Sequence, residues 1–83
     1  MRVVKEVVTK HGKITIFSWN NRYLIKVEQA LLEQTYKINQ FDVSSEEELL
    51  KIIDDTFLDE CAERFEQMSK TLHDALHRAG QMG

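Results

Sequence analysis

The strongest structural signal in the chain is the stretch HGKITIFSWNNRYLIKVEQ, residues 11–29. Residues 13–19 and 22–29 alternate between apolar and polar side chains and are rich in β-branched and aromatic types, a pattern typical of strands with one buried face. Asn20 and Asn21 separate the two segments, and asparagine tolerates the positive φ angles that a two-residue hairpin turn requires. The stretch therefore predicts a β-hairpin.

Two more strands are predicted beside this hairpin, at residues 3–9 and 33–38, because both segments are rich in residues that fit a pleated surface. His11-Gly12 supplies a tight turn before the hairpin, whereas the break near Ala30-Leu31 contains no residue typical of turns. Connections this short make neighbouring strands antiparallel. Residues 1–43 therefore predict a four-stranded antiparallel meander.

The alternation also predicts which side chains share a face of the sheet. On one face, a cross-strand row of Val7, Ile16, Ile25 and Tyr36, with Ile14 beside Val27 and Tyr23 beside Ile38, is expected to form the core. The opposite face is expected to be only half apolar. It mixes Val4, Val8, Phe17, Trp19 and Leu24 with Glu6, Thr15, Arg22, Lys26 and Lys37.

The periodicity changes near Ser44, where SSEEELLKIIDD begins a predicted helix over residues 45–54. Ser44 or Ser45 can cap its first turn, and Glu47 or Glu48, three residues later, can close a capping box. A corner at residues 54–56 then separates it from a long helix over residues 56–79, which Gly80 is expected to end. The predicted fold class is α+β, ββββαα, with both helices packed on one face of the sheet.

A length of 83 residues is that of a single domain. With 42% hydrophobic and 30% charged residues, the chain has the composition of a globular protein and lies outside the range typical of disorder. The single cysteine, Cys61, favours a reducing compartment. The stretch MRVVKEVV lacks the apolar run typical of a signal peptide, and no apolar run reaches the length of a membrane span. A cytoplasmic location is therefore expected, with no membrane association. Residues 1–43 carry seven basic and four acidic residues, and residues 44–83 carry four and ten. The net charge of −3 argues against general nucleic-acid binding.

The long helix carries more apolar surface than the sheet can cover. Its apolar stripe, spaced alternately three and four residues apart, consists of Leu58, Cys61, Phe65, Met68, Leu72, Ala75 and Ala79, widened by Phe57, Ala62 and Leu76. A helix of about 24 residues is about 36 Å long, whereas a strand of eight residues spans about 26 Å. About two turns, carrying Leu72 and Leu76, should therefore extend past the sheet. This predicts a homodimer with C2 symmetry, the alternative being that these turns fray or pack on the short helix.

The half-apolar sheet face is a second candidate surface, on which Phe17, Trp19 and Leu24 lie next to Arg22. Exposed aromatic and basic residues on a four-stranded sheet are typical of proteins that bind single-stranded nucleic acid. The RRM fold, however, has helices between its strands, and none is predicted here. The favoured interpretation is that Trp19 stacks on Arg22 across the turn, or that this face packs against a partner protein or a second subunit.

The segment HDALH places His73 and His77 one helical turn apart, with Asp74 between them. It resembles the zinc-binding HExxH motif if aspartate replaces glutamate. A catalytic zinc site needs a third protein ligand, for which His11 and Cys61 are distant candidates. Near a helix C-terminus, histidine and arginine also interact favourably with the helix dipole, and Asp74 has Arg78 four residues on as a partner. The pair is therefore a candidate only for weak metal binding.

Other catalytic chemistry finds no support. Cys61 lies on the apolar stripe, the serines have no assembled histidine and acid, and neither phosphate-binding glycine motif occurs. A ligand pocket between sheet and helices, lined by Tyr23, Tyr36 and His11, is a further possibility. The sequence therefore predicts a non-enzymatic protein-protein interaction module without a cofactor, which self-associates through the long helix, the sheet face, or both.

Overall fold

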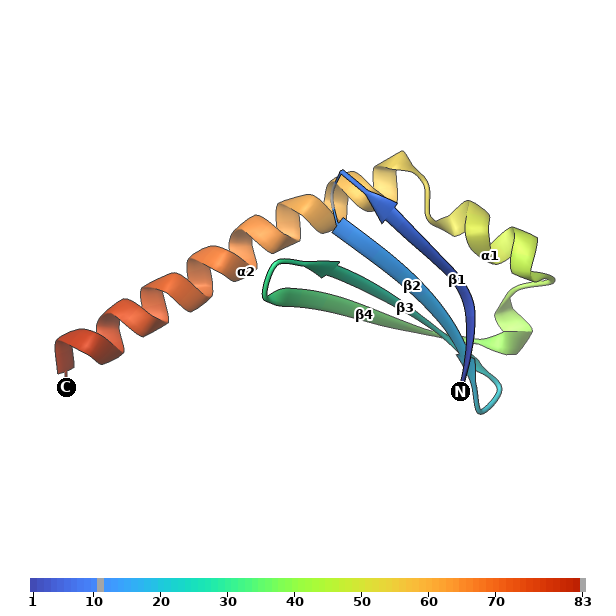
Figure 1. Ribbon diagram of the computed structural model, residues 1–83, viewed down its shortest axis with the longest axis horizontal. Coiled ribbons are helices and arrows are strands. Elements are labelled where there is room, and N and C mark those ends of the chain that lie inside the picture. Colours follow the sequence, from blue (N-terminus) through green and yellow to red (C-terminus); the bar gives the residue numbers. More distant parts are fainter. Residues whose placement is uncertain (11, 83) are drawn as a thin grey trace.

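The computed structural model describes residues 1–10 and 12–82, with the backbone alone for residues 81 and 82, and has the predicted ββββαα order (Figure 1). Four strands form one open sheet in the order β1-β2-β3-β4, each antiparallel to the next. A short 3-10 helix, not predicted, leads to the two α-helices. The elements are β1 Arg2–Thr9, β2 Gly12–Trp19, β3 Arg22–Gln29, β4 Leu32–Asn39, η1 Gln40–Asp42, α1 Glu46–Ile52 and α2 Asp55–Met82.

The central β2–β3 hairpin has the predicted register. Trp19 pairs with Arg22 across the turn, and Asn20 and Asn21 have φ angles of 55° and 62°. Positive φ at both central residues matches the right-handed twist of the flanking strands. The predicted row continues across β3 and β4, where Ile25 pairs with Tyr36.

The β1–β2 register differs from the predicted one. Val7 pairs with Ile14 rather than Ile16, because Gly12 already belongs to β2 and pairs with Thr9. A shift of two residues keeps Val7 on the core face, since side chains alternate with period two. The predicted turn at His11-Gly12 lies partly outside the described residues, because His11 is not among them.

A β-bulge between Val3 and Lys5 corrects the predicted position of Val4. Val3 pairs with Phe17 and Lys5 with Ile16, so Val4 is an extra residue without a partner in β2. An inserted residue changes the alternation on one side of the bulge. Val4 consequently packs against the core cluster, and Val3 takes the place predicted for Val4 beside Phe17.

The third turn contains a strained residue. Gln29 pairs with Leu32, which leaves Ala30 and Leu31 as a two-residue connection, and Ala30 has a φ of 53°. A side chain at positive φ costs about 1 kcal/mol for residues other than glycine, asparagine and aspartate. The prediction of a break here is confirmed although the sequence contains no typical turn residue.

Replacing Ala30 by glycine should stabilise the protein by about 0.5–1 kcal/mol, because glycine adopts positive φ without a steric penalty and exposed Ala30 contributes little packing. Urea unfolding measures the change. The control is Asn21→Gly, which should have a smaller effect because asparagine already tolerates this conformation. A loss of stability in Ala30→Gly would contradict the strain.

Helix α1 begins with the predicted serine cap, Ser45, but Glu48 accepts from Ser44 and does not close the predicted box on Ser45. The Glu48 backbone N–H donates to Ser45 Oγ over 3.1 Å, and Glu48 Oε2 accepts from the Ser44 backbone N–H over 2.8 Å and from the Ser44 hydroxyl. These hydrogen bonds from Ser44 hold the pKa of Glu48 below its ordinary value of 4.5. Glu48 therefore links the chain before the helix to its first turn.

The stability that Glu48 contributes should depend on pH. A carboxyl whose pKa is lower in the folded state stabilises the fold above its unfolded value, and that contribution is lost as the pH falls through the folded pKa. Glu48→Gln should therefore be less stable than the parent chain at neutral pH, and the difference should shrink below about pH 4.5. Urea midpoints measured across this range test it. Glu47→Gln, which removes a carboxylate from the same turn, is the matched control.

Helix α2 starts at a capped corner and ends later than predicted. Asp54 Oδ1 accepts a hydrogen bond of 2.8 Å from the Phe57 backbone N–H, as expected for a capping aspartate. At the other end, the helix continues through Gly80 to Met82, so the predicted end at Ala79 is wrong. Glycine favours helix termination but costs only about 1 kcal/mol inside a helix, so it does not force an end.

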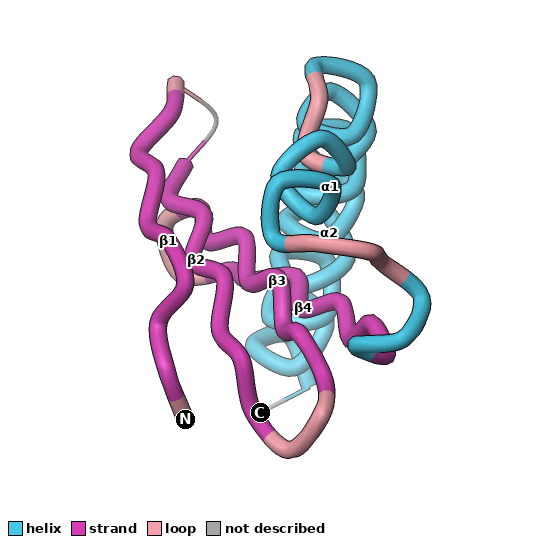
Figure 2. Tube along the Cα trace, turned by 90° about the vertical axis from the view of Figure 1, so that its right-hand side faces the viewer, coloured by secondary structure: helices cyan, strands magenta, loops and turns pink. Residues whose placement is uncertain are grey.

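Both α-helices lie on one side of the sheet (Figure 2). The core lies between them and that face of the sheet. Its buried members are Ile14, Ile16, Tyr23, Ile25, Val27, Leu49, Cys61 and Phe65. Polar contacts also join β4 to α2: Gln34 Nε2 donates to the Cys61 carbonyl over 2.9 Å, and Tyr36 Oη donates to Gln34 Oε1 over 2.9 Å. The ring of Tyr36 packs 5.2 Å from that of Phe57.

Helix α2 extends well past the sheet (Figure 1). Its 28 residues span about 42 Å, against about 26 Å for each eight-residue strand. The radius of gyration is 15.5 Å, whereas a compact chain of this length has about 12 Å. The C-terminal part of α2 therefore has no sheet beneath it.

Candidate interaction surfaces

The first candidate surface is the apolar stripe on the projecting part of α2, which we call the overhang stripe: Leu72, Ala75, Leu76 and Ala79. Leu72 is 47% and Leu76 64% exposed, while Ala75 is half-buried and Ala79 exposed. Phe65 is the last fully buried residue of the helix, and Met68, one turn on, still packs against the core. The structure thus leaves uncovered the turns that carry Leu72 and Leu76, which the lengths of the helix and the strands predicted to extend past the sheet.

A charged pair lies on the side of α2 opposite to the overhang stripe. Lys70 Nζ and Asp74 Oδ2 form an ion pair of 2.6 Å on the exposed side of the helix. The sequence predicted Arg78 as the partner of Asp74, but Lys70, one turn earlier, takes this role. The three residues lie on one helical line, four apart, so either cation can reach the carboxylate. An exposed pair of this kind contributes at most about 0.5 kcal/mol.

The second candidate surface is the sheet face away from the helices. Phe17 pairs with Leu24, both half-buried, and Trp19, 49% exposed, pairs with Arg22. A shallow hollow of about 280 Å³ runs along this apolar region and includes Phe17 and Leu24 in its lining. All four residues predicted for a sheet-face partner site are therefore side by side.

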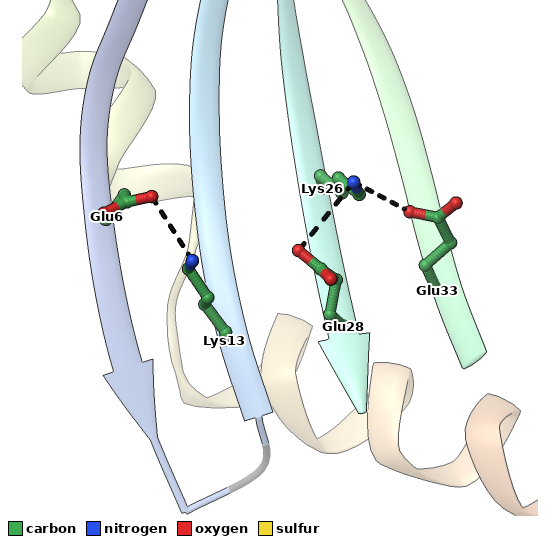
Figure 3. A network of polar contacts seen from close by, with 5 residues as sticks. All are labelled: Glu6, Lys13, Lys26, Glu28 and Glu33. Atoms are coloured by element: carbon green, nitrogen blue, oxygen red, sulfur yellow. Dashed lines mark ion pairs between the residues drawn. The ribbon is translucent and has the colours of Figure 1, made fainter. Parts of the chain in front are cut away.

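Ion pairs occupy the other half of this face (Figure 3). Lys13 lies 3.4 Å from Glu6, and Lys26 lies between Glu33, at 3.3 Å, and Glu28, at 3.9 Å. Two ammonium groups thus face three carboxylates, so this half carries no excess of positive charge. Binding of nucleic acid depends mainly on cations available for phosphate, which leaves Arg22 and Lys37 beside the aromatic residues. Binding of single-stranded nucleic acid stays a prediction that the charge distribution does not favour.

The two histidines of the HDALH segment lie exposed on the projecting helix. Among the described residues, no group of three or more His, Cys, Asp or Glu side chains is placed to hold a metal ion. Cys61 is buried in the core, and His11 lies outside the described residues. The structure therefore brings no third ligand from its described part to His73 and His77.

The two tyrosines predicted to line a ligand pocket make other contacts instead. Tyr23 is part of the core, and Tyr36 is engaged with Gln34 and lies 3.8 Å from Cys61 Sγ. The pKa of Tyr36 is raised above its ordinary value, mainly by burial and to a smaller extent by the hydrogen bond to Cys61. A cavity does lie between sheet and helices, but at the β1 edge, and its lining includes Lys5, which the sequence reasoning missed. The signal for Lys5 was its position two residues before Val7, which puts it on the predicted core face because side chains alternate with period two.

No family model, curated protein or solved structure matches the chain.

In the described part of the chain, no helix has both the length and the apolar character needed to cross a bilayer.

Proposed function

We propose that the protein is a non-enzymatic interaction module that forms a homodimer through the overhang stripe of α2. The observation that carries this proposal is the exposure of Leu72 and Leu76 on a helix that projects beyond its own sheet. Two large apolar side chains next to each other on a projecting rod favour an apolar partner. A second copy supplies an identical stripe, as a two-fold symmetric interface requires.

We expect two α2 helices to pack antiparallel and to cross at Leu72. Two-fold symmetry through Leu72 places Met68 of one copy opposite Leu76 of the other, so that the apolar side chains form one continuous layer. Lys70 and Asp74 lie about 160° around the helix from Leu72, so their ion pair stays on the solvent side of each helix.

The dimer is expected to be weak. Fully burying a leucine contributes about 1.5–3 kcal/mol, and roughly half of that remains available from side chains as exposed as Leu72 and Leu76. This gain is opposed by the loss of translational and rotational freedom on association. We therefore expect a weak, reversible dimer, to be sought at protein concentrations of about 10 µM to 1 mM.

Sedimentation equilibrium over this concentration range tests the proposal. The parent chain should rise from the monomer mass of 9.8 kDa toward twice that value. Leu72→Ser combined with Leu76→Ser should stay monomeric, with the far-ultraviolet circular dichroism of a folded chain, because neither leucine belongs to the buried core. The matched control, Gln67→Ser with His77→Ser, alters the polar side of the same helix and should dimerise like the parent.

A third variant distinguishes the two candidate surfaces. Trp19→Ser removes the most exposed aromatic side chain of the sheet face and should leave the dimer intact. If Trp19→Ser abolished association and the leucine variant did not, the interface would be the sheet face. A parent chain that remained at 9.8 kDa at all concentrations would overturn self-association altogether.

A further inference from the structure

The cavity at the β1 edge is a pocket with a predominantly apolar lining and a volume of about 240 Å³. Its apolar lining consists of Val7, Ile14, Ile16, Leu50, Ile53 and Leu58, contributed by the sheet, by α1 and by the beginning of α2. Thr9 and Lys5 complete the lining. No lining residue lies on the projecting part of α2, so the pocket is independent of the proposed dimer.

Regular pairing of β1 after the β-bulge keeps Lys5 on the apolar face of the sheet, the face of Val7. Lys5 pairs with Ile16, a core residue, and its neighbour Glu6 points to the other face, where it pairs with Lys13. Lys5 is exposed and lines the pocket. Its ammonium group can therefore remain solvated at the opening of the pocket while its methylenes cover the apolar wall.

Lys5 forms no ion pair with the described residues, whereas Arg2, Lys13 and Lys26 do. Asp55 and Asp59 line an adjoining hollow, which shares Thr9 and Leu58 with the pocket and also includes Lys10. The pocket therefore combines an apolar interior with one cation that lacks an ionic partner in the described part of the chain.

From this combination we propose that the pocket binds a medium-chain carboxylate, with the apolar tail inside and the carboxylate on the Lys5 ammonium group. An apolar cavity of about 150 Å³ accommodates benzene, so 240 Å³ accommodates about ten non-hydrogen atoms, the size of octanoate. A shorter acid leaves part of the apolar wall wet, and an alcohol of the same length lacks the charge that Lys5 complements.

The chain-length dependence of binding tests the apolar half of the proposal. Titrating butyrate, hexanoate and octanoate to millimolar concentration into protein with ¹³C-labelled isoleucine methyl groups should shift the signals of Ile14, Ile16 and Ile53. Affinity should rise about tenfold for each two methylenes, because each buried methylene contributes about 0.8 kcal/mol. If octanoate shifts none of these signals, or does so no better than butyrate, the pocket does not bind the tail.

Two lysine variants test the charged half. Lys5→Met keeps a long apolar stem and should weaken octanoate binding about fivefold, while leaving the affinity for octanol unchanged. Lys37→Met, on the opposite face of the sheet, should bind octanoate like the parent. Equal octanoate affinity in Lys5→Met and the parent would overturn recognition of the carboxylate by Lys5.

Discussion

Replacing Phe65 by alanine is expected to lower the free energy of unfolding by about 3–5 kcal/mol. Phe65 is 1% exposed and belongs to the core cluster in which α2 meets the sheet. The substitution removes the ring from water-free surroundings and leaves a cavity that neighbouring side chains fill only in part. Because small domains have total stabilities of about 5–15 kcal/mol, this single change should remove a large part of the stability.

The chain contains a matched control for this experiment. Phe41, in the short 3-10 helix, is 91% exposed, so Phe41→Ala makes the same chemical change without opening a cavity and should cost less than about 0.5 kcal/mol. Urea unfolding at equilibrium compares the two. Phe65→Leu, which keeps most of the apolar volume, provides an intermediate value if the alanine variant is largely unfolded in water. Similar losses for Phe65→Ala and Phe41→Ala would contradict the position of Phe65.

Replacing Gly12 by alanine should cost about 2–4 kcal/mol. A Cβ atom at this position would lie 2.1 Å from the Glu28 carbonyl oxygen of the neighbouring strand, far inside the contact distance. Gly12 also has a φ of 130°, a conformation that residues with a side chain rarely adopt. Relief requires a shift of the β3 backbone, which is held on both sides by hydrogen bonds to β2 and β4.

Gly80 provides the opposite control. It lies within α2, and apart from its chain neighbours and the backbone of its own helix, no atom of the described residues lies within 4 Å of the position its Cβ would take. Gly80→Ala should therefore stabilise the helix by up to about 1 kcal/mol, since alanine has the higher helix propensity. The midpoint temperature of thermal unfolding should fall below that of the parent for Gly12→Ala and rise above it for Gly80→Ala. A Gly12→Ala variant as stable as the parent would contradict the close approach of β2 and β3.

Much of the fold is predictable from local patterns. The asparagine pair and the alternating apolar residues around it are sufficient for the β2–β3 register, because turn type and the buried face impose the same pairing. Ser45 and Asp54 likewise mark the starts of the two α-helices, since a capping side chain acts on the backbone two or three residues later. In each case the interacting groups are neighbours in the chain.

The structure differs from the prediction at residues for which two arrangements have similar energies. The bulge at Val4 has no marker in the sequence, because an inserted valine suits either face of an edge strand. Helix α2 passes Gly80 because one glycine is too small a penalty to end a long helix. Asp74 pairs with Lys70, although Arg78 also lies one turn away. Their spacing alone does not select between the two cations. Small energy differences of this kind are decided by the surroundings.

The sequence pattern alone was enough to predict the elements, their order, the buried face of the sheet and a helix longer than the strands it covers. These depend on periodicity and on residue lengths, which are local quantities. The tertiary structure decided where along α2 the cover ends, which leaves Leu72 and Leu76 exposed after Phe65 is buried. It also placed Lys5 at the opening of an apolar pocket. Both surfaces depend on how elements distant in the chain meet, and burial is a property of that meeting rather than of any one segment.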